Sequence, residues 1–236
     1  MKVYLTNLNE SWIVDRLREE WYQHNTSISV DSIKQAEIIW IIAPWLWKKI
    51  KKKHLRDKKV VCSIYHLEDK DFEHKQIRDF KKRDSFVDVY HVISLKTKNE
   101  LEKLTDKEII YIPFWSDQLS WYEIKDKESL RKKYNLPLDA YILGSFQRDT
   151  EGSDLKSPKL IKGPDRLVKI IEAKNRDSDK LVVLLSGKRR QYIIKELENL
   201  NITYKYFEMV ETDQLNELYN CLDLYVVSSR IEGGPQ

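Results

Sequence analysis

Short runs of consecutive apolar residues recur along this chain, and amphipathic segments separate them. A run that is apolar throughout, such as EIIWIIA at 37–43 or KVVCSIY at 59–65, is typical of a strand covered on both faces of a parallel sheet. The intervening segments have helical periodicity, as Val14, Leu17 and Trp21 show at i, i+3 and i+7. This alternation predicts an α/β fold with parallel sheets. The expected strands are 3–5, 37–43, 59–65, 88–94, 109–112, 141–145, 181–185, 203–207 and 222–227, and the expected helices are 12–24, 96–104, 129–134, 164–173, 191–200 and 213–221.

A polar stretch at 116–128 interrupts this rhythm, and we expect the linker between two domains there. The 236 residues suffice for two small domains. We therefore predict two Rossmann-like units in series, residues 1–120 and 121–236. Sheets of this kind bind ligands at the carboxyl ends of their strands.

The composition narrows the class of protein. The net charge of +4 comes from 42 basic and 38 acidic residues that are mostly interspersed, which disfavours a nucleic-acid partner. Cys62 and Cys221 lie in or beside apolar stretches and are expected to be buried free thiols in a reducing compartment. No signal peptide opens the chain and no apolar run reaches the roughly 18 to 20 residues of a membrane span, so a cytoplasmic location is expected. We find no zinc-ligand spacing.

The closing segment SSRIEGGPQ, at 228–236, follows the last expected strand and has the composition of a ligand loop. Gly233 and Gly234 would let backbone N–H groups come close to a ligand, and a helix starting just after them and Pro235 would add its positive end. Glu232 beside them can accept hydrogen bonds from hydroxyl groups. An anion cradle next to a hydroxyl acceptor suits a sugar nucleotide.

Two cations occur in the loop after the expected strand 141–145. Arg148 follows the strand closely, and Lys162 precedes Gly163-Pro164, where proline suits the first turn of a helix. An arginine and a lysine near a strand exit and a helix N-terminus can form a clamp for a diphosphate. The alternative is a solvated basic loop, because short basic pairs are common.

The second half of the chain resembles the donor-binding domain of family 4 glycosyltransferases, which are retaining enzymes of the GT-B fold. The resemblance rests on Arg148 after the first strand, Lys162 in a Lys-Gly-Pro-Asp motif, and the Ser-Arg-x-Glu-Gly-x-Pro pattern from Ser229 to Pro235. It implies that Arg148 and Lys162 neutralise the donor diphosphate, that Glu232 contacts hydroxyls of the transferred sugar, and that the glycine amides help to hold the donor. The family's second glutamate would fall beyond Gln236, so we expect a C-terminally truncated, incomplete second domain.

The same resemblance extends to three further strand exits. Gly187 follows the strand 181–185 where the family has a glycine near the nucleotide, and Met209 and Val210 follow the strand 203–207 where its backbone meets the base. In the first half, His66 follows the strand 59–65, where the family often has a histidine facing the reaction centre; the alternative is an ordinary surface histidine. We accordingly expect His66, Arg148, Lys162 and Glu232 to be the catalytic residues.

The first half also departs from the family. Where many members have a glycine pair after the first strand, this chain has Asn7, Leu8, Asn9 and Glu10. Asp69 and Asp71, in the loop after His66, could contact acceptor hydroxyls, although acidic loop residues are usually only solvated.

The segment Trp45 to Arg56, WLWKKIKKKHLR, combines aromatic residues with six lysines or arginines. As a helix it could lie on an anionic membrane surface, which would suit a lipid-linked acceptor at the inner face of a membrane. The alternative is a crossover helix that packs Leu46, Ile50 and Trp47 inward and exposes its lysines.

The leading hypothesis is a retaining glycosyltransferase that moves a sugar from a nucleoside-diphosphate donor to a hydroxyl acceptor on a glycan, a lipid-linked molecule or a small molecule, as in the biosynthesis of cell-envelope polysaccharides. With two fixed cations, neither a metal nor another cofactor is expected. The rivals are a truncated or degenerate module that binds a nucleotide sugar without turnover, and a sugar-nucleotide epimerase of the GT-B fold.

Overall fold

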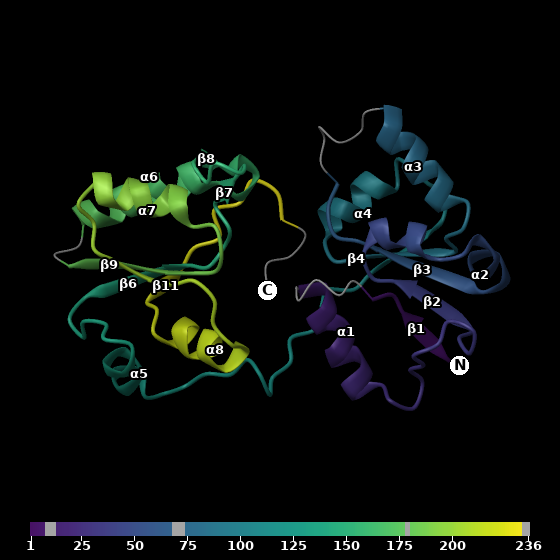
Figure 1. The fold of residues 1–236 in the computed structure, drawn as a ribbon, viewed down its shortest axis with the longest axis horizontal. Coiled ribbons are helices and arrows are strands. Elements are labelled where there is room, and N and C mark those ends of the chain that lie inside the picture. Colours follow the sequence, from purple (N-terminus) through teal and green to yellow (C-terminus); the bar gives the residue numbers. More distant parts are fainter. Residues whose placement is uncertain (8–12, 68–73, 178–179, 233–236) are drawn as a thin grey trace. The chain divides into compact units, whose positions relative to one another are not determined.

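The computed structural model describes residues 1–7, 13–67, 74–177 and 180–232. Met1–Trp115, with which Glu232 is grouped, form one compact unit, and Ser116–Ile231 form the other. The division follows residue 115, at the start of the polar stretch in which we expect the linker, rather than residue 120. Each unit is an α/β unit built on its own parallel sheet (Figure 1).

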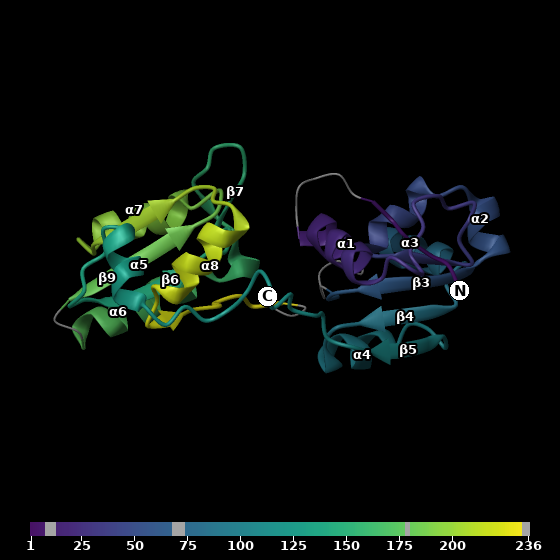
Figure 2. The same cartoon turned by 90° about the horizontal axis from the view of Figure 1, so that it is seen from below.

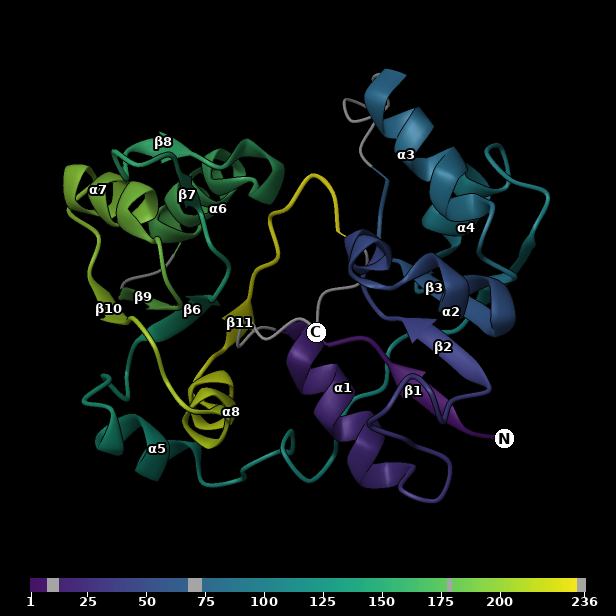
Figure 3. The same cartoon turned by 45° about the vertical axis from the view of Figure 1, so that its right-hand side comes forward.

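The first unit contains a five-stranded parallel sheet in the order β1-β2-β3-β4-β5. In Figures 1 and 3, α1 lies on one side of this sheet and α3 and α4 lie on the other. The strands are β1 (Val3–Leu5), β2 (Ile38–Ile41), β3 (Lys59–Ile64), β4 (Val89–Val92) and β5 (Glu108–Tyr111), and the helices are α1 (Ile13–His24), the 3₁₀ helix η1 (Pro44–Lys49), α2 (Lys52–Asp57), α3 (His74–Asp84) and α4 (Leu95–Leu101).

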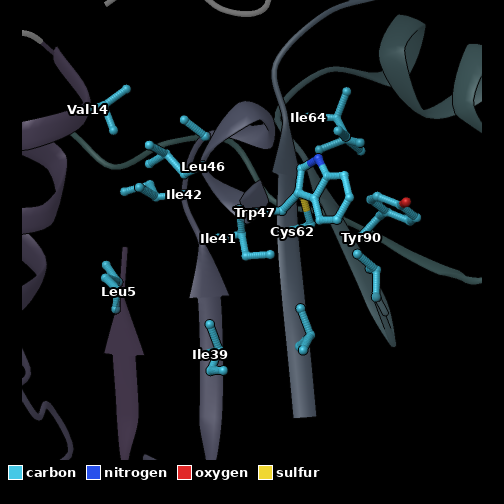
Figure 4. Close-up of a cluster of buried hydrophobic side chains, with 14 of the residues drawn as sticks. Leu5, Val14, Ile39, Ile41, Ile42, Leu46, Trp47, Cys62, Ile64 and Tyr90 are labelled. Carbon is cyan, nitrogen blue, oxygen red and sulfur yellow. The ribbon is translucent and has the colours of Figure 1, made fainter. Parts of the chain in front are cut away.

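Alternate residues of the central strands build the main core of this unit. Ile39 and Ile41 of β2 pack with Cys62 and Ile64 of β3, and all four side chains are almost fully buried (Figure 4). Leu46 and Trp47 of η1 close the same cluster. Each strand therefore gains most of its stability from apolar burial between sheet and helices.

The opposite face of the first sheet contains a network of hydrogen-bonded polar side chains instead. Trp40 Nε1 donates to Ser63 Oγ (2.9 Å), Ser63 Oγ lies 2.9 Å from His91 Nδ1, and His91 Nε2 lies 2.7 Å from the carbonyl oxygen of Ile112. Because a carbonyl can only accept, Nε2 carries the proton and Nδ1 accepts from Ser63. With His91 neutral, each hydrogen bond of this network therefore has both a donor and an acceptor.

The second unit contains a four-stranded parallel sheet in the order β10-β9-β6-β11 and a two-stranded antiparallel hairpin. Figure 2 shows the unit from below, with α5 and α8 in front of the sheet, whereas α6 and α7 lie behind it. The elements are α5 (Lys127–Lys133), β6 (Tyr141–Ser145), β7 (Thr150–Glu151), β8 (Ser157–Pro158), η3 (Leu160–Lys162), α6 (Pro164–Arg176), β9 (Leu181–Ser186), α7 (Gln191–Asn199), β10 (Tyr204–Phe207), α8 (Thr212–Asn220) and β11 (Leu224–Tyr225).

Strand β9 shows why this sheet is covered twice. Leu181, Val183 and Leu185 belong to the core under α6 and α7, whereas Val182 and Leu184 belong to the core under α5 and α8. Successive side chains of a strand point to opposite faces, so an unbroken apolar run fits only a strand between two helical layers.

Two expectations about individual elements are wrong. The run 222–227 is not a buried strand of six residues: β11 spans two residues, and Leu224 is 41% exposed. An incomplete second domain would leave this strand as an exposed edge, and among the described residues no strand pairs with its outer side. The segment Trp45 to Arg56 is not one helix, since extended backbone at Ile50 and Lys51 separates η1 from α2. Its packing follows the crossover alternative, with Leu46 and Trp47 buried and Lys51–Lys53 exposed.

The buried histidine makes the stability of the first unit depend on pH. Burial lowers the pKa of His91 from its ordinary value of 6.5, so the unfolded chain binds this proton more readily than the folded one. The contribution to the free energy of unfolding is thus complete above pH 6.5 and falls as the pH decreases below it. We expect the wild type to lose more stability between pH 7.5 and 5.5 than His91→Gln, measured by denaturant unfolding; parallel pH curves for the two proteins would contradict this.

Candidate functional site

All four strands of the second sheet are parallel, so their carboxyl ends lie along one edge. At this edge β6 ends at Ser145, β9 at Ser186, β10 at Phe207 and β11 at Tyr225. Gly187 follows the end of β9 directly, and Arg148 and Met209 follow the ends of β6 and β10 within three residues. The edge is therefore the place where a ligand of this unit is expected.

A hairpin folds the long loop between β6 and α6 back on itself, so that the start of the loop, near Arg148, approaches its finish, near Lys162. Strands β7 and β8 pair antiparallel, with Thr150 opposite Pro158, and the backbone N–H of Lys159 donates to the carbonyl oxygen of Asp149 (2.7 Å). Arg148 immediately precedes this hairpin, and Lys162 follows it as the last residue of η3. Arg148 is exposed, and its Nε donates to the carbonyl oxygen of Thr150 at 2.9 Å.

Gly163 turns the chain from η3 into α6. Its φ of 63° is left-handed, a conformation that glycine adopts without steric cost, and Pro164 follows as the first residue of the helix. A Cβ atom on Gly163 would lie 2.0 Å from the carbonyl oxygen of Ser228. The loop after β11 therefore lies directly against the backbone of the Lys162 turn.

Hydrogen bonds hold this loop to the Lys162 turn. Ser228 Oγ donates to the carbonyl oxygen of Lys162 (3.0 Å). The backbone N–H of Arg230 donates to the carbonyl oxygen of Ile161 (2.8 Å). The Arg230 guanidinium forms a bidentate pair with Asp165, with N–O distances of 2.7 and 2.6 Å. Hydrogen bonds from Arg230 hold the pKa of Asp165 down at about 2.

The same loop also reaches the exit of β6. Ser229 Oγ donates to Gln147 Oε1 at 3.2 Å, one residue before Arg148. The segment 228–230 thus joins the Arg148 loop and the Lys162 turn. Glu232, which follows it, is half-buried, whereas Gly233, Gly234 and Pro235 lie outside the described residues.

The exits of β9 and β10 are joined by backbone contacts. Gly187 has a φ of 91°, its N–H donates to the carbonyl oxygen of Phe207 (3.2 Å), and its own carbonyl accepts from Tyr206 Oη (3.0 Å). Met209, after β10, is 63% exposed, whereas Val210 packs against the core under α5 and α8. Of these two residues, Met209 presents its side chain to solvent.

In the first unit, His66 is an exposed residue immediately after Tyr65 at the exit of β3. Asp69 and Asp71 lie outside the described residues, as do Leu8, Asn9 and Glu10, whereas Asn7 is exposed after β1. Within the ranges that the structure describes, no group of three or more His, Cys, Asp or Glu side chains could hold a metal ion. The described helices include none that is long and apolar enough to cross a membrane.

Sequence reasoning missed two charged pairs at this edge. One is Arg230 with Asp165, because we read the Ser-Arg-x-Glu motif only as a ligand loop and not as a loop that binds the Lys-Gly-Pro-Asp turn. The other is Arg190 with Asp149, which are 0% and 3% exposed. Nothing in the run Lys188-Arg189-Arg190 distinguishes a buried arginine from a solvated one.

Comparison with known proteins places the fold. No protein-family model and no curated sequence matches the chain significantly. Among solved structures, Anabaena HepE in complex with UDP has a TM-score of 0.72 at 12% identity, over 98% of this chain and 75% of HepE. The glycosyltransferase WaaG of lipopolysaccharide biosynthesis has a TM-score of 0.64 at 12% identity, over 99% of this chain and 76% of WaaG. Sucrose-phosphate synthase from Thermosynechococcus elongatus has a TM-score of 0.65 at 14% identity, over 98% of this chain and 59% of the synthase.

These likenesses confirm the α/β fold with parallel sheets and match it to that of GT-B glycosyltransferases.

The contact at Gly163 generates a stability prediction. Gly163→Ala should lower the free energy of unfolding by about 3 kcal/mol, because left-handed strain adds to a clash with the Ser228 backbone. Gly152→Ala is the matched control: its φ is 77°, but its Cβ would meet only the end of the Asp154 side chain, so a loss of about 1 kcal/mol is expected. Equal losses in denaturant unfolding would show that the Ser228 contact carries no weight.

Proposed function

We propose that this chain is a retaining glycosyltransferase of the family 4 kind, which transfers a sugar from a nucleoside-diphosphate donor to a hydroxyl acceptor. The observation that carries the proposal is the joining of two cationic loops to the sugar-motif loop. Ser228 and Arg230 bind the Lys162 turn, and Ser229 binds Gln147 beside Arg148. The loop that precedes Glu232 and the backbone or side chains next to the two proposed cations thus belong to one hydrogen-bonded assembly.

The chemistry follows from the charges. Arg148 and Lys162 would neutralise the negative charge that develops on the departing diphosphate, which is electrostatic stabilisation of the transition state. Because two fixed cations can do this, we propose that donor activation needs no metal ion. Glu232 would accept hydrogen bonds from hydroxyls of the transferred sugar, with the amides of Gly233 and Gly234 contributing to the cradle together with Pro235.

Two further groups complete the proposed site. Gly187, Met209 and Val210 would meet the nucleoside, since they follow β9, the neighbour of β6, and β10, the strand beyond it. His66 is proposed as the residue of the first unit that faces the reaction centre, on the ground of its place after β3. The solved structures of HepE contain UDP, UDP with glucose, or UDP-glucose, which makes a uridine donor the first to test.

The proposed clamp predicts specific losses of affinity. Arg148→Ala and Lys162→Ala should each raise the Kd for UDP by about tenfold to a hundredfold, since one charge-assisted contact is worth about 1.5 to 3 kcal/mol. Isothermal titration calorimetry with UDP measures this. Lys169→Ala, on α6, removes the same charge from an exposed helical position and should leave the Kd unchanged. An unchanged Kd for a folded Arg148→Ala protein would refute the clamp.

Turnover separates transfer from its rivals. A transferase should release UDP from UDP-glucose in the presence of a hydroxyl acceptor, and an acid-base epimerase should change the sugar without releasing UDP. A protein that binds UDP-glucose and other UDP-sugars but converts none of them would be a binding module.

We further propose that the first unit associates with an anionic membrane surface at the inner face. Trp45, which is 45% exposed at the start of η1, adjoins the exposed residues Lys48, Lys49 and Lys51–Lys53. An exposed aromatic ring beside clustered lysines suits the boundary between headgroups and acyl chains.

Replacing Lys51, Lys52 and Lys53 with Glu should abolish most binding to vesicles that contain phosphatidylserine, as measured by co-sedimentation. The control replaces Lys132, Lys169 and Lys195 with Glu, which changes the net charge equally on exposed helical positions of the second unit. If both triple variants bind the vesicles as the wild type does, the membrane proposal fails.

A further inference from the structure

The second unit buries an arginine beneath the exit of β6. Arg190, just before α7, has no exposed surface, and its Nε lies 3.0 Å from Oδ2 of Asp149, which is itself buried. Asp149 is the residue after Arg148. The buried pair is therefore adjacent in the chain to the cation that we propose to bind the donor diphosphate.

Arg190 contacts both ends of the segment that contains Arg148. Its Nη2 donates to Ser145 Oγ (3.3 Å), at the last residue of β6, while its Nε faces Asp149. Only residues 146–148 lie between these two contacts. One guanidinium thus fixes the start and the end of this short segment.

Backbone contacts reinforce the arrangement. The N–H groups of Asp149 and Thr150 both donate to the carbonyl oxygen of Arg189, at 3.2 and 3.1 Å. Arg189 holds a left-handed φ of 61°, which costs free energy in a residue with a side chain. Thr150 in turn accepts the hydrogen bond from Arg148 Nε at 2.9 Å, so the side chain of Arg148 is anchored to a residue that the pair holds in place.

The pair is costly for a purely structural element. Burial lowers the pKa of Arg190 and raises that of Asp149. Arg190 Nε and Nη1 and Asp149 Oδ2 are buried with no hydrogen-bond partner in the described part of the chain, although Nε and Oδ2 lie 3.0 Å apart as an ion pair. Apolar residues of similar volume often replace a buried ion pair without loss of stability. Retention of the charges, with two donors unsatisfied, fits a role in geometry.

We propose that Asp149 and Arg190 are positioning residues for donor binding, which fix the β6 exit loop so that Arg148 is preorganised for the diphosphate. The inference rests on the proposed function of Arg148. Neither residue needs to touch the donor, because both act through the segment 146–148.

A double-mutant cycle tests this with UDP as the probe. Arg148→Ala is measured in two backgrounds: the wild type, and the variant Asp149→Leu with Arg190→Met, which lacks both charges. Positioning predicts that Arg148→Ala weakens UDP binding about tenfold or more in the wild type but about twofold or less without the pair. An equal factor in both backgrounds would overturn the inference.

Controls distinguish positioning from general damage. Arg131→Met breaks another ion pair of the same unit, in which Nη2 of the buried Arg131 lies 2.6 Å from Oδ2 of the more exposed Asp223, the residue before β11. In that background Arg148→Ala should keep its full effect; a reduced effect would mean that any loss of stability suffices, and would overturn the inference. If the pair-less variant does not fold, Arg190→Lys replaces it, since one ammonium group cannot span Ser145 and Asp149, and the same criterion applies.

The cycle also separates this inference from the function on which it rests. Arg148→Ala without any effect in the wild-type background would refute the diphosphate contact itself, and the positioning role with it. Equal effects in the two backgrounds would refute the positioning role alone.

Discussion

The parallel pairing of β6 with β9 and β11 determines where the candidate site residues of the second unit lie. Leu143 pairs with Val183 on one side and with Leu224 on the other, so three strands end along one edge. Every loop that leaves this edge starts from a fixed point. The apolar burial of β9 between two helical layers supplies the free energy that maintains this register, and the loops themselves add little apolar area.

The loops are then held by backbone contacts and charges. Gly163 accepts the close approach of Ser228 because it has no side chain, and Arg230 closes that contact with Asp165. On the other side, Arg190 holds the loop that contains Arg148. The loops at this edge are thus fixed on both sides without an apolar core of their own, and such rigidity is what the proposed binding of a charged ligand requires.

The sequence was informative where apolar burial decides the structure. The run 141–145 predicts β6 with its observed bounds, because its residues are buried or partly buried in a sheet that helices cover on both faces. Helix α3 was not predicted, because residues 74–84 are mostly charged and show no apolar period. Among the residues of this helix whose burial is described, Phe80 is the buried apolar one. The hairpin β7–β8 was also missed, since four strand residues in a polar loop carry no period.

For the site, strand exits could be read from sequence, but partners could not. Arg148 and Lys162 stand out because cations near a strand exit and a helix start suggest an anion. The pairing of Arg230 with Asp165 joins residues 65 positions apart, and it depends on the register of β11 against β6. Arg190 was missed because burial of a charge is decided by tertiary packing and not by its neighbours in the chain.

The hydrogen bonds of Ser228 and Arg230 place the closing motif under two separate constraints. These two residues hold the loop after β11 against the Lys162 turn whatever ligand the unit binds, whereas the role proposed for Glu232 concerns the ligand alone. Among related chains, the Ser-Arg part should therefore vary with the fold of this loop. The glutamate should vary with the ligand, so the two parts of one short motif need not be retained together.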